Sequence, residues 1–206
     1  YLYNGLQQYD RAIQVYFQAN DRGLLDEGGK YALVIALHGR QRYGESIPVL
    51  RDLVERAAGN LEYRARLMEA YHYAQRPEDL VAFIDETDEY FHADDRWNEA
   101  AMAVLARGCL VGDLNERAIG YFNEAIALHQ RTRPNRGVGD GVLSDYYQEV
   151  STAHVKLGQT DKAVDAACGA IVSWGRRQNE RQQAIDSLVS VLRGIPDRDA
   201  YVARLD

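Results

Sequence analysis

The stretch that decides the fold is Tyr9-Asp-Arg-Ala12-Ile13-Gln-Val-Tyr16-Phe-Gln-Ala19. In it, Ala12, Tyr16 and Ala19 are spaced to lie on one face of a helix. Adding 34 to these residue numbers gives a second, similar face of mainly small and apolar residues. Successive further steps of 34, 38 and 45 give three more. The four later copies are Ser46, Leu50 and Leu53; Leu80, Ile84 and Thr87; Ala118, Phe122 and Ala125; and Ala163, Ala167 and Ala170.

A second helix is predicted before each later copy. Short turns join the two helices, and three of these turns contain a glycine, at Gly39, Gly112 and Gly158. We expect glycine to end the first helix of the pair because it tolerates a positive φ. The repeating unit is therefore an all-α helix–turn–helix. The core faces predicted for the first helices are Leu33, Val34 and Leu37; Leu67, Met68 and Tyr71; Leu105, Ala106 and Cys109; and Val150, Ser151 and His154.

This unit resembles the tetratricopeptide (TPR) repeat, whose signature combines Trp-x2-Leu-Gly-x2-Tyr with a later Ala-x3-Phe and a further Ala. Leu33, Leu67 and Leu105 match its leucine position, whereas the glycine position and the late proline are not matched. The resemblance implies an α-α superhelix, a right-handed solenoid of antiparallel helix pairs. We therefore predict a single TPR-like array over residues 1–206, divided into a partial repeat 1–26, repeats 27–60, 61–94, 99–132 and 144–177, and C-terminal capping helices over 178–206.

The two ends of the chain lead to further expectations. The chain lacks an initiator Met and Tyr1 falls partway through a first helix, so we expect the array to continue upstream in a larger protein. Capping helices are expected over Asn179–Arg193 and Ala200–Leu205. With no signal peptide visible, a cytoplasmic location is favoured. The absence of an apolar run of about 18 residues argues against membrane insertion.

Charge and cysteine content exclude other classes of protein. The 206 residues carry 24 Lys and Arg against 31 Asp and Glu, a net charge of -7, which argues against nucleic acid as a partner. Two cysteines cannot form a disulfide framework or a Cys-rich zinc site. The acidic excess lies mainly in the run from Asp85 to Asp95, which either steers a basic partner segment or is a solvated face.

A metal site is the strongest enzymatic alternative. Glu69 with His72, and Glu89 with His92, have the Glu-x-x-His spacing that di-iron bundles use. Both pairs fall in one repeat and are expected to face different directions, so we predict no metal, no cofactor and no enzymatic activity. The Gly-rich segment 134–141 lacks a phosphate-loop pattern and is expected to be a flexible connection that binds an anion weakly at most.

The resemblance also implies a binding surface, because the first helices of TPR arrays line a groove that accepts an extended peptide or a helix. The groove residues expected here are Tyr31, Ile35, His38, Arg66, Glu69, His72, Tyr73, Arg107 and Gln148. The Lys/Asn clamp of chaperone-tail receptors is not matched. We predict a protein-interaction scaffold with a protein or peptide partner. The alternatives left open are a regulatory module of an enzyme whose catalytic domain lies elsewhere, and a homo-oligomer formed through the first helices.

Overall fold

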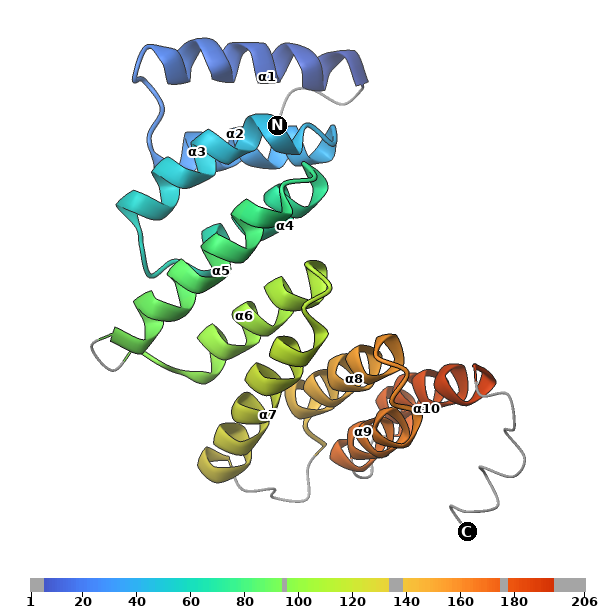
Figure 1. Cartoon of the computed structure of the whole chain (residues 1–206). Coiled ribbons are helices and arrows are strands. Elements are labelled where there is room, and N and C mark those ends of the chain that lie inside the picture. Colours follow the sequence, from blue (N-terminus) through green and yellow to red (C-terminus); the bar gives the residue numbers. More distant parts are fainter. Residues whose placement is uncertain (1–5, 94–95, 134–138, 175–177, 195–206) are drawn as a thin grey trace. The chain divides into compact units, whose positions relative to one another are not determined.

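The computed structural model describes residues 6–93, 96–133, 139–174 and 178–194, apart from the side chains of 6–9, 178–181 and 183. Within these ranges the regular secondary structure is helical (Figure 1). The helices are α1 (Leu6–Asp21), α2 (Glu27–Gly39), α3 (Tyr43–Arg56), α4 (Leu61–Tyr73), α5 (Pro77–His92), α6 (Glu99–Val111), α7 (Asn115–Thr132), α8 (Gly141–Lys156), α9 (Thr160–Ser173) and α10 (Gln178–Arg193).

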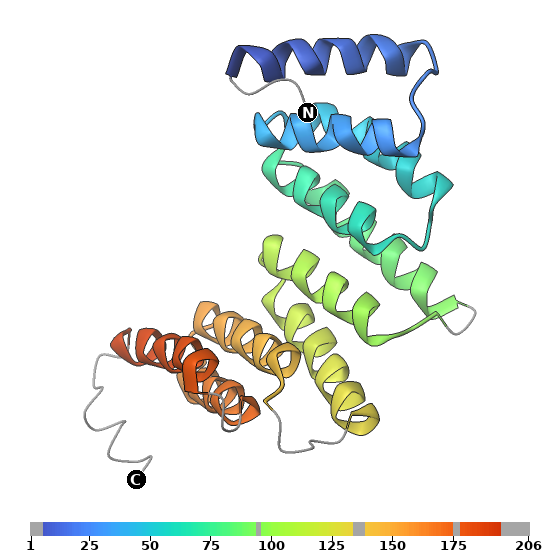
Figure 2. The same cartoon turned by 180° about the vertical axis from the view of Figure 1, so that it is seen from behind.

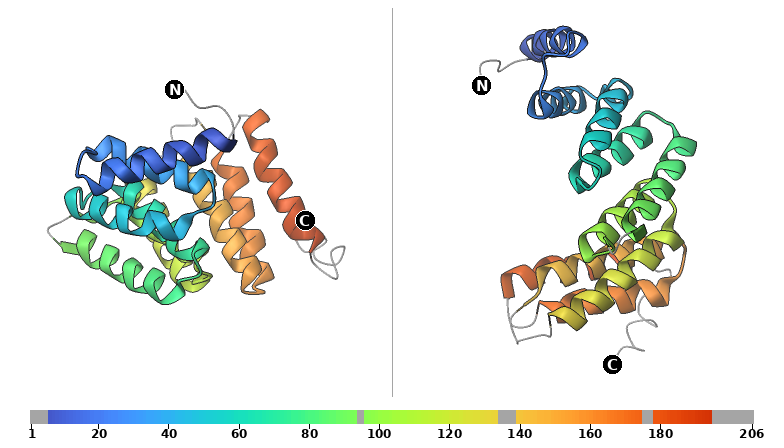
Figure 3. Two further views of the ribbon diagram at one scale, coloured as in Figure 1. Left: turned by 90° about the horizontal axis from the view of Figure 1, so that it is seen from above. Right: turned by 90° about the vertical axis from the view of Figure 1, so that its left-hand side faces the viewer.

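The chain divides into two compact units, residues 1–96 and 97–206, and each is described on its own. In unit 1, each helix from α1 to α5 packs on the next one along the chain, as Figures 1 and 2 show from opposite sides. In unit 2, α6 to α10 pack in the same sequential way, and α10 also contacts α8 (Figure 3). Neighbour-to-neighbour packing is typical of repeat proteins, whose units bury their apolar faces only by stacking.

Each first helix of a pair begins at an Asp or Asn whose side chain accepts hydrogen bonds from the first turn. Asp26 caps α2, Asn60 caps α4, Asn98 caps α6 and Asp140 caps α8. The carboxylate or amide oxygen satisfies backbone N–H groups that have no partner within the helix. The second helices α3, α5, α7 and α9 have no such side-chain cap. These caps mark where each repeat begins.

The turn inside each pair has one backbone pattern, and it corrects the role predicted for glycine. Gln41, Gln75, Asp113 and Gly158 have positive φ values of 57° to 68°, and the next residue donates its N–H back to the last buried residue of the first helix. For example, the Arg76 N–H lies 2.9 Å from the Tyr71 carbonyl oxygen. Gly39 and Gly112 do not have a positive φ, so glycine supplies this conformation at one turn only. At the other three, the six-residue hydrogen-bonded turn holds a non-glycine residue there.

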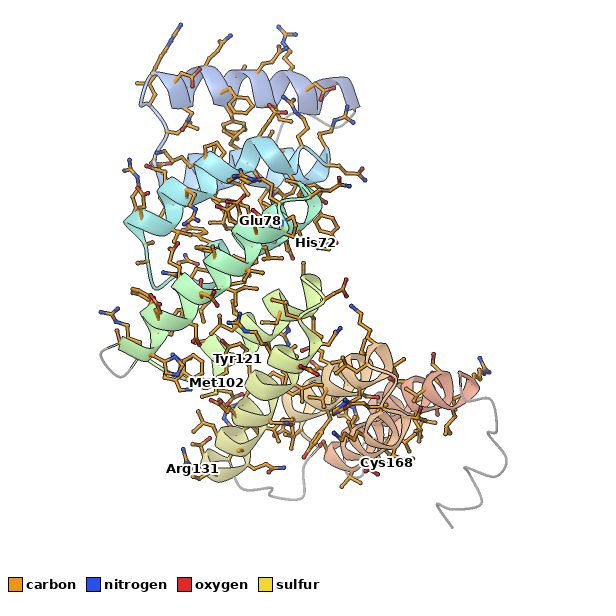
Figure 4. All side chains as sticks on the ribbon, viewed as in Figure 1. His72, Glu78, Met102, Tyr121, Arg131 and Cys168 are labelled. Carbon is orange, nitrogen blue, oxygen red and sulfur yellow. The ribbon has the colours of Figure 1, made fainter. Side chains whose placement is uncertain are left out.

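Burial confirms the predicted core faces of the paired helices. All twelve predicted residues of the first helices and all twelve of α3, α5, α7 and α9 are buried. In unit 2, Met102 (Figure 4), Phe122 and Tyr146 join several alanines in one cluster. Alanine lets helix backbones approach, while the large side chains fill the space that is left. On α1, by contrast, Ala12, Tyr16 and Ala19 are only partly buried.

The connection before α8 is held more firmly than the sequence suggests. A Cβ on Gly139 would lie 2.3 Å from the carbonyl oxygen of Trp174, and one on Gly141 would lie 2.8 Å from its ring. Between them, the Asp140 N–H donates to the Ser173 carbonyl oxygen at 2.8 Å. Only glycine allows so close an approach. The two glycines therefore fasten the start of α8 to the end of α9, although residues 134–138 of the predicted flexible connection lie outside the described residues.

The C-terminal helix agrees in part with the predicted cap. Helix α10 spans nearly the expected residues and packs on α9, with Ala184 fully buried. The second expected capping helix, at Ala200–Leu205, lies outside the described residues. The grouping of all repeats into a single array also stays a prediction.

Candidate partner-binding surface

In unit 1, four predicted or neighbouring groove residues form one polar network across α2 and α4. The Tyr31 hydroxyl donates to Glu62 Oε1 at 2.7 Å, and Arg66 Nε donates to the same oxygen at 2.9 Å. Arg66 also donates to Glu69 Oε2 at 3.1 Å. Hydrogen bonds from Tyr31 and Arg66 lower the pKa of Glu62, so the carboxylate is held in its charged form. The structure thus places Tyr31, Arg66 and Glu69 together, with the charges partly exposed.

Apolar side chains are exposed beside this network. Ile35, one helical turn from Tyr31, is 45% exposed, and Tyr73 at the end of α4 is 57% exposed. Tyr73 stacks on Tyr43 with ring centroids 4.6 Å apart, and His72 meets Tyr73 edge-on at 5.0 Å. His72 itself is exposed (Figure 4). A surface that combines exposed aromatic and aliphatic groups with hydrogen-bonding charges suits a polypeptide partner.

His38 and His72 hold equivalent sequence positions but have different surroundings. His38 is partly buried, and one ring nitrogen lies 2.9 Å from Ser46 Oγ. Burial lowers the pKa of His38 to about 4, with a further contribution from the positive charge of Arg66. His38 is therefore neutral near pH 7. Its place at the edge of the surface, beside the Tyr43 ring at 4.9 Å, is that of a packing residue.

Unit 2 has a corresponding surface on its first helices, α6 and α8. Arg107 Nε donates to Glu149 Oε1 at 2.9 Å, which links the two helices. Gln148 donates instead to Ser144 on its own helix at 3.3 Å. Burial raises the pKa of Glu149 although Arg107 opposes the shift, and its Oε2 atom is buried with no hydrogen-bond partner among the described residues. Arg107 and Gln148 thus lie on two linked helices, and neither of these hydrogen bonds joins one to the other.

Two contributors were missed by sequence reasoning. Tyr43 begins a second helix, yet the tight turn brings it beside the ends of α2 and α4. Glu149 follows the predicted Gln148 by one residue and makes the bond to Arg107. The sequence signal for Glu149 is the opposite charge of Arg107 in the preceding repeat. This charge indicates a contact only when the relative register of the two helices is known.

The Glu-x-x-His pairs do not come together as a metal site. Glu69 is engaged by Arg66, and His92 bonds to the Asp88 carbonyl oxygen four residues earlier on α5. Across the described ranges, no group of three or more His, Cys, Asp or Glu side chains is arranged to hold a metal ion.

A buried ionic cluster in unit 2 was also missed. His129, on the last turn of α7, is 1% exposed, with Nδ1 2.9 Å from Glu99 Oε1 and Nε2 2.5 Å from Asp140 Oδ2. The Tyr146 hydroxyl donates to the same Glu99 oxygen at 3.1 Å. Burial alone would lower the pKa of His129, but the hydrogen bonds to both carboxylates outweigh it and raise the pKa. With both ring nitrogens occupied, His129 fastens α6, α7 and α8 and has no nitrogen left for proton transfer to a substrate.

Comparisons with known proteins agree with this architecture. No protein-family model matches the chain, and no curated protein matches it. Solved structures do: BtubC from P. vanneervenii is 15% identical with a TM-score of 0.63, over 96% of this chain and 85% of that one. A thermophilic TPR protein of Thermus thermophilus is 14% identical with a TM-score of 0.56, over 89% and 92%. A MamA protein is 18% identical with a TM-score of 0.52, over 94% and 88%.

These likenesses, together with the helix pairs, establish the fold. The chain has the all-α fold of TPR proteins, the α-α superhelix class built from antiparallel helix pairs. At this level of identity the likeness concerns the fold alone. In the part of the chain that the structure describes, no helix is both long and apolar enough to cross a membrane.

Proposed function

We propose that this chain is a protein-interaction module and that it binds an extended peptide or a helix of a protein partner on the first-helix surface of unit 1. The surface consists of Tyr31 and Ile35 on α2 and Arg66, Glu69 and Tyr73 on α4. The observation that carries the proposal is the combination of exposed apolar groups with a charge network fixed by hydrogen bonds. The TPR fold supports it, because helical-repeat arrays use such surfaces for polypeptides.

The charge network suits recognition because it is organised before binding. Arg66 is held between Glu62 and Glu69, so little side-chain freedom remains to be lost when a partner adds a further hydrogen bond. The half-exposed carboxylate of Glu69 can accept from a partner N–H group, and Ile35 and Tyr73 provide exposed apolar contact. Arg107 and Gln148 are proposed to form a second partner-binding surface, within unit 2.

The experiment is a binding measurement with a partner identified by co-purification from the source cell. Combined charge reversal, Arg66→Glu with Glu69→Arg, is expected to weaken affinity at least tenfold, and Ile35→Asp should do the same by charging an apolar contact. Matched controls are Glu55→Arg on α3 and Val15→Asp on α1, both at exposed positions off this surface. Circular dichroism checks that every variant is folded. Unchanged affinity in the surface variants would refute the proposal.

The alternative function, a regulatory module of an enzyme whose catalytic domain lies elsewhere, would use the same surface. It differs in placing the partner within the same gene product. Catalytic assay of the full-length product with and without the Arg66→Glu and Glu69→Arg pair separates the two functions.

A further inference from the structure

Unit 2 contains a cavity of about 570 Å³ that the proposed binding surface does not use. Its walls come from the last turn of α7, the first half of α8 and the second half of α9. Leu143, Tyr147, Cys168 and Val172 make it largely apolar. A volume of this size can hold a large side chain or a small molecule.

The cavity is separate from the first-helix surface. Tyr147 lies on the side of α8 that faces α7 and α9, whereas Glu149 contacts Arg107 on α6. The Tyr147 ring lies against Gly169, where an added Cβ would come within 2.9 Å of it, and its hydroxyl accepts from Gln130 at 3.2 Å. Gly169 thus leaves room for the ring, which forms a fixed wall that bridges two helices.

The rim of the cavity is basic in an otherwise acidic chain. Arg133 lines the cavity, and Arg131 precedes it on α7 (Figure 4); neither guanidinium makes a hydrogen bond or an ion pair among the described residues. The acidic group in the lining, Asp140, is already bonded to His129, whose pKa is raised toward the cationic form. The rim therefore attracts an anion.

One apolar residue of the cavity lining is also exposed to solvent. Val172, which lines the cavity, is 73% exposed. Exposed apolar groups beside a hollow, with charge at the rim, are characteristic of an anchor-residue pocket at a protein interface.

We propose that this cavity is a second docking site, which receives one large apolar side chain of an acidic partner segment. Carboxylates that flank the anchor side chain pair with Arg133 and Arg131. The site goes beyond the peptide-binding function proposed for α2 and α4, and neither depends on the other.

The test uses fluorescein-labelled glutamate-rich peptides with one central Phe, Leu or Trp, measured by fluorescence anisotropy against the whole chain. At least one is expected to bind, and replacing its central residue with Ala should weaken binding about tenfold or more. A lysine-rich peptide with the same central residue should bind at least tenfold more weakly. If none of the three acidic peptides binds, or if the Ala peptide binds as well as its parent, the proposal is overturned.

Variants locate the binding on the molecule. Val172→Glu and Arg133→Glu should each weaken binding of the best acidic peptide about tenfold, whereas Val155→Glu and Lys162→Glu, at exposed positions outside the cavity, should leave it unchanged. Tyr73→Ala in unit 1 should also have no effect, which separates this site from the first-helix surface. Equal affinity in all variants would refute the site.

Cys168 provides a reporter that does not depend on substitution. Its thiol lines the cavity (Figure 4), while Cys109 is fully buried, so N-ethylmaleimide should modify Cys168 in the folded chain. A saturating acidic peptide should slow this reaction several-fold, and the modified chain should no longer bind the peptide. Unchanged modification kinetics would overturn the proposal. So would a dimer, detected by sedimentation, that Val172→Glu dissociates, because it would assign the cavity to a second copy of this chain.

Discussion

Replacing His129 with leucine removes the imidazole that unit 2 buries between Glu99 and Asp140. Two hydrogen bonds to charged groups are lost, each of which contributes about 1.5–3 kcal/mol. The two carboxylates, 19% and 30% exposed, are left without their shared partner. Breaking a buried ion pair by removing one side costs about 3–5 kcal/mol, and we expect His129→Leu to lower the free energy of unfolding by that amount.

His154 gives a matched control in the same unit. It is also buried, but its hydrogen bond at 2.9 Å is to the neutral amide of Gln159. His154→Leu should therefore cost only about 1 kcal/mol for the hydrogen bond. Urea unfolding followed by tryptophan fluorescence suits both variants, because both tryptophans of the chain, Trp97 and Trp174, belong to unit 2.

The effect of pH distinguishes the ionic role of His129 from simple packing. The pKa of His129 is raised in the folded state, so its stabilisation is complete below the unfolded value of about 6.5 and is lost as pH rises through the folded pKa. The pKa of Asp140 is lowered, so its stabilisation is present above the unfolded value of about 3.9 and is lost as pH falls through the folded pKa. The difference between the native chain and His129→Leu should therefore be largest between about pH 4 and 6.5. A difference that is the same at pH 5.5 and pH 9, or no larger than that of His154→Leu, would refute this reasoning.

Further predictions concern the backbone and the core. Gln75→Gly should raise the free energy of unfolding by about 0.5–1 kcal/mol in urea titrations, since Gln75 has a φ of 57°, whereas Gly158→Ala, at 68°, should lower it by about 1 kcal/mol. Gly120→Ala should raise the melting temperature because nothing lies within 4 Å of the added Cβ in α7, but Gly139→Ala should lower it because its Cβ would lie 2.3 Å from a backbone oxygen. Arg64→Ala should lower the free energy of unfolding by about 2–4 kcal/mol, since Arg64 is only 2% exposed and its guanidinium is hydrogen-bonded and packed on aromatic rings. A loss below about 1 kcal/mol would contradict that role.

The repeat could be predicted from sequence because it depends on local periodicity. Buried apolar residues such as Leu67 and Phe122 recur at helical spacing. A small helical hairpin with such an apolar face must stack on its neighbours to bury it. The positive-φ position was misplaced because a turn of this kind is fixed by its hydrogen bonds rather than by glycine alone. Gln41 and Asp113 accept the conformation that Gly39 and Gly112 were expected to supply.

Contacts between distant residues could not be predicted in the same way. His129 lies outside the repeating slots, and its partners are 30 and 11 residues away, so periodicity gives no reason to associate them. The grouping of Tyr31, Arg66 and Glu69 was anticipated because the TPR resemblance supplied the register of the first helices. The stacking of Tyr43 on Tyr73 was not anticipated, since the close approach of the turn to α4 is a tertiary feature.

Hydrogen–deuterium exchange of the chain, with and without its partner at saturation, tests the central claim most directly. The account predicts slower exchange in α2 and α4 on binding, where Tyr31, Ile35, Arg66 and Tyr73 are located, and little change in α3. Slower exchange confined to α3 and α5, with α2 and α4 unchanged, would contradict it.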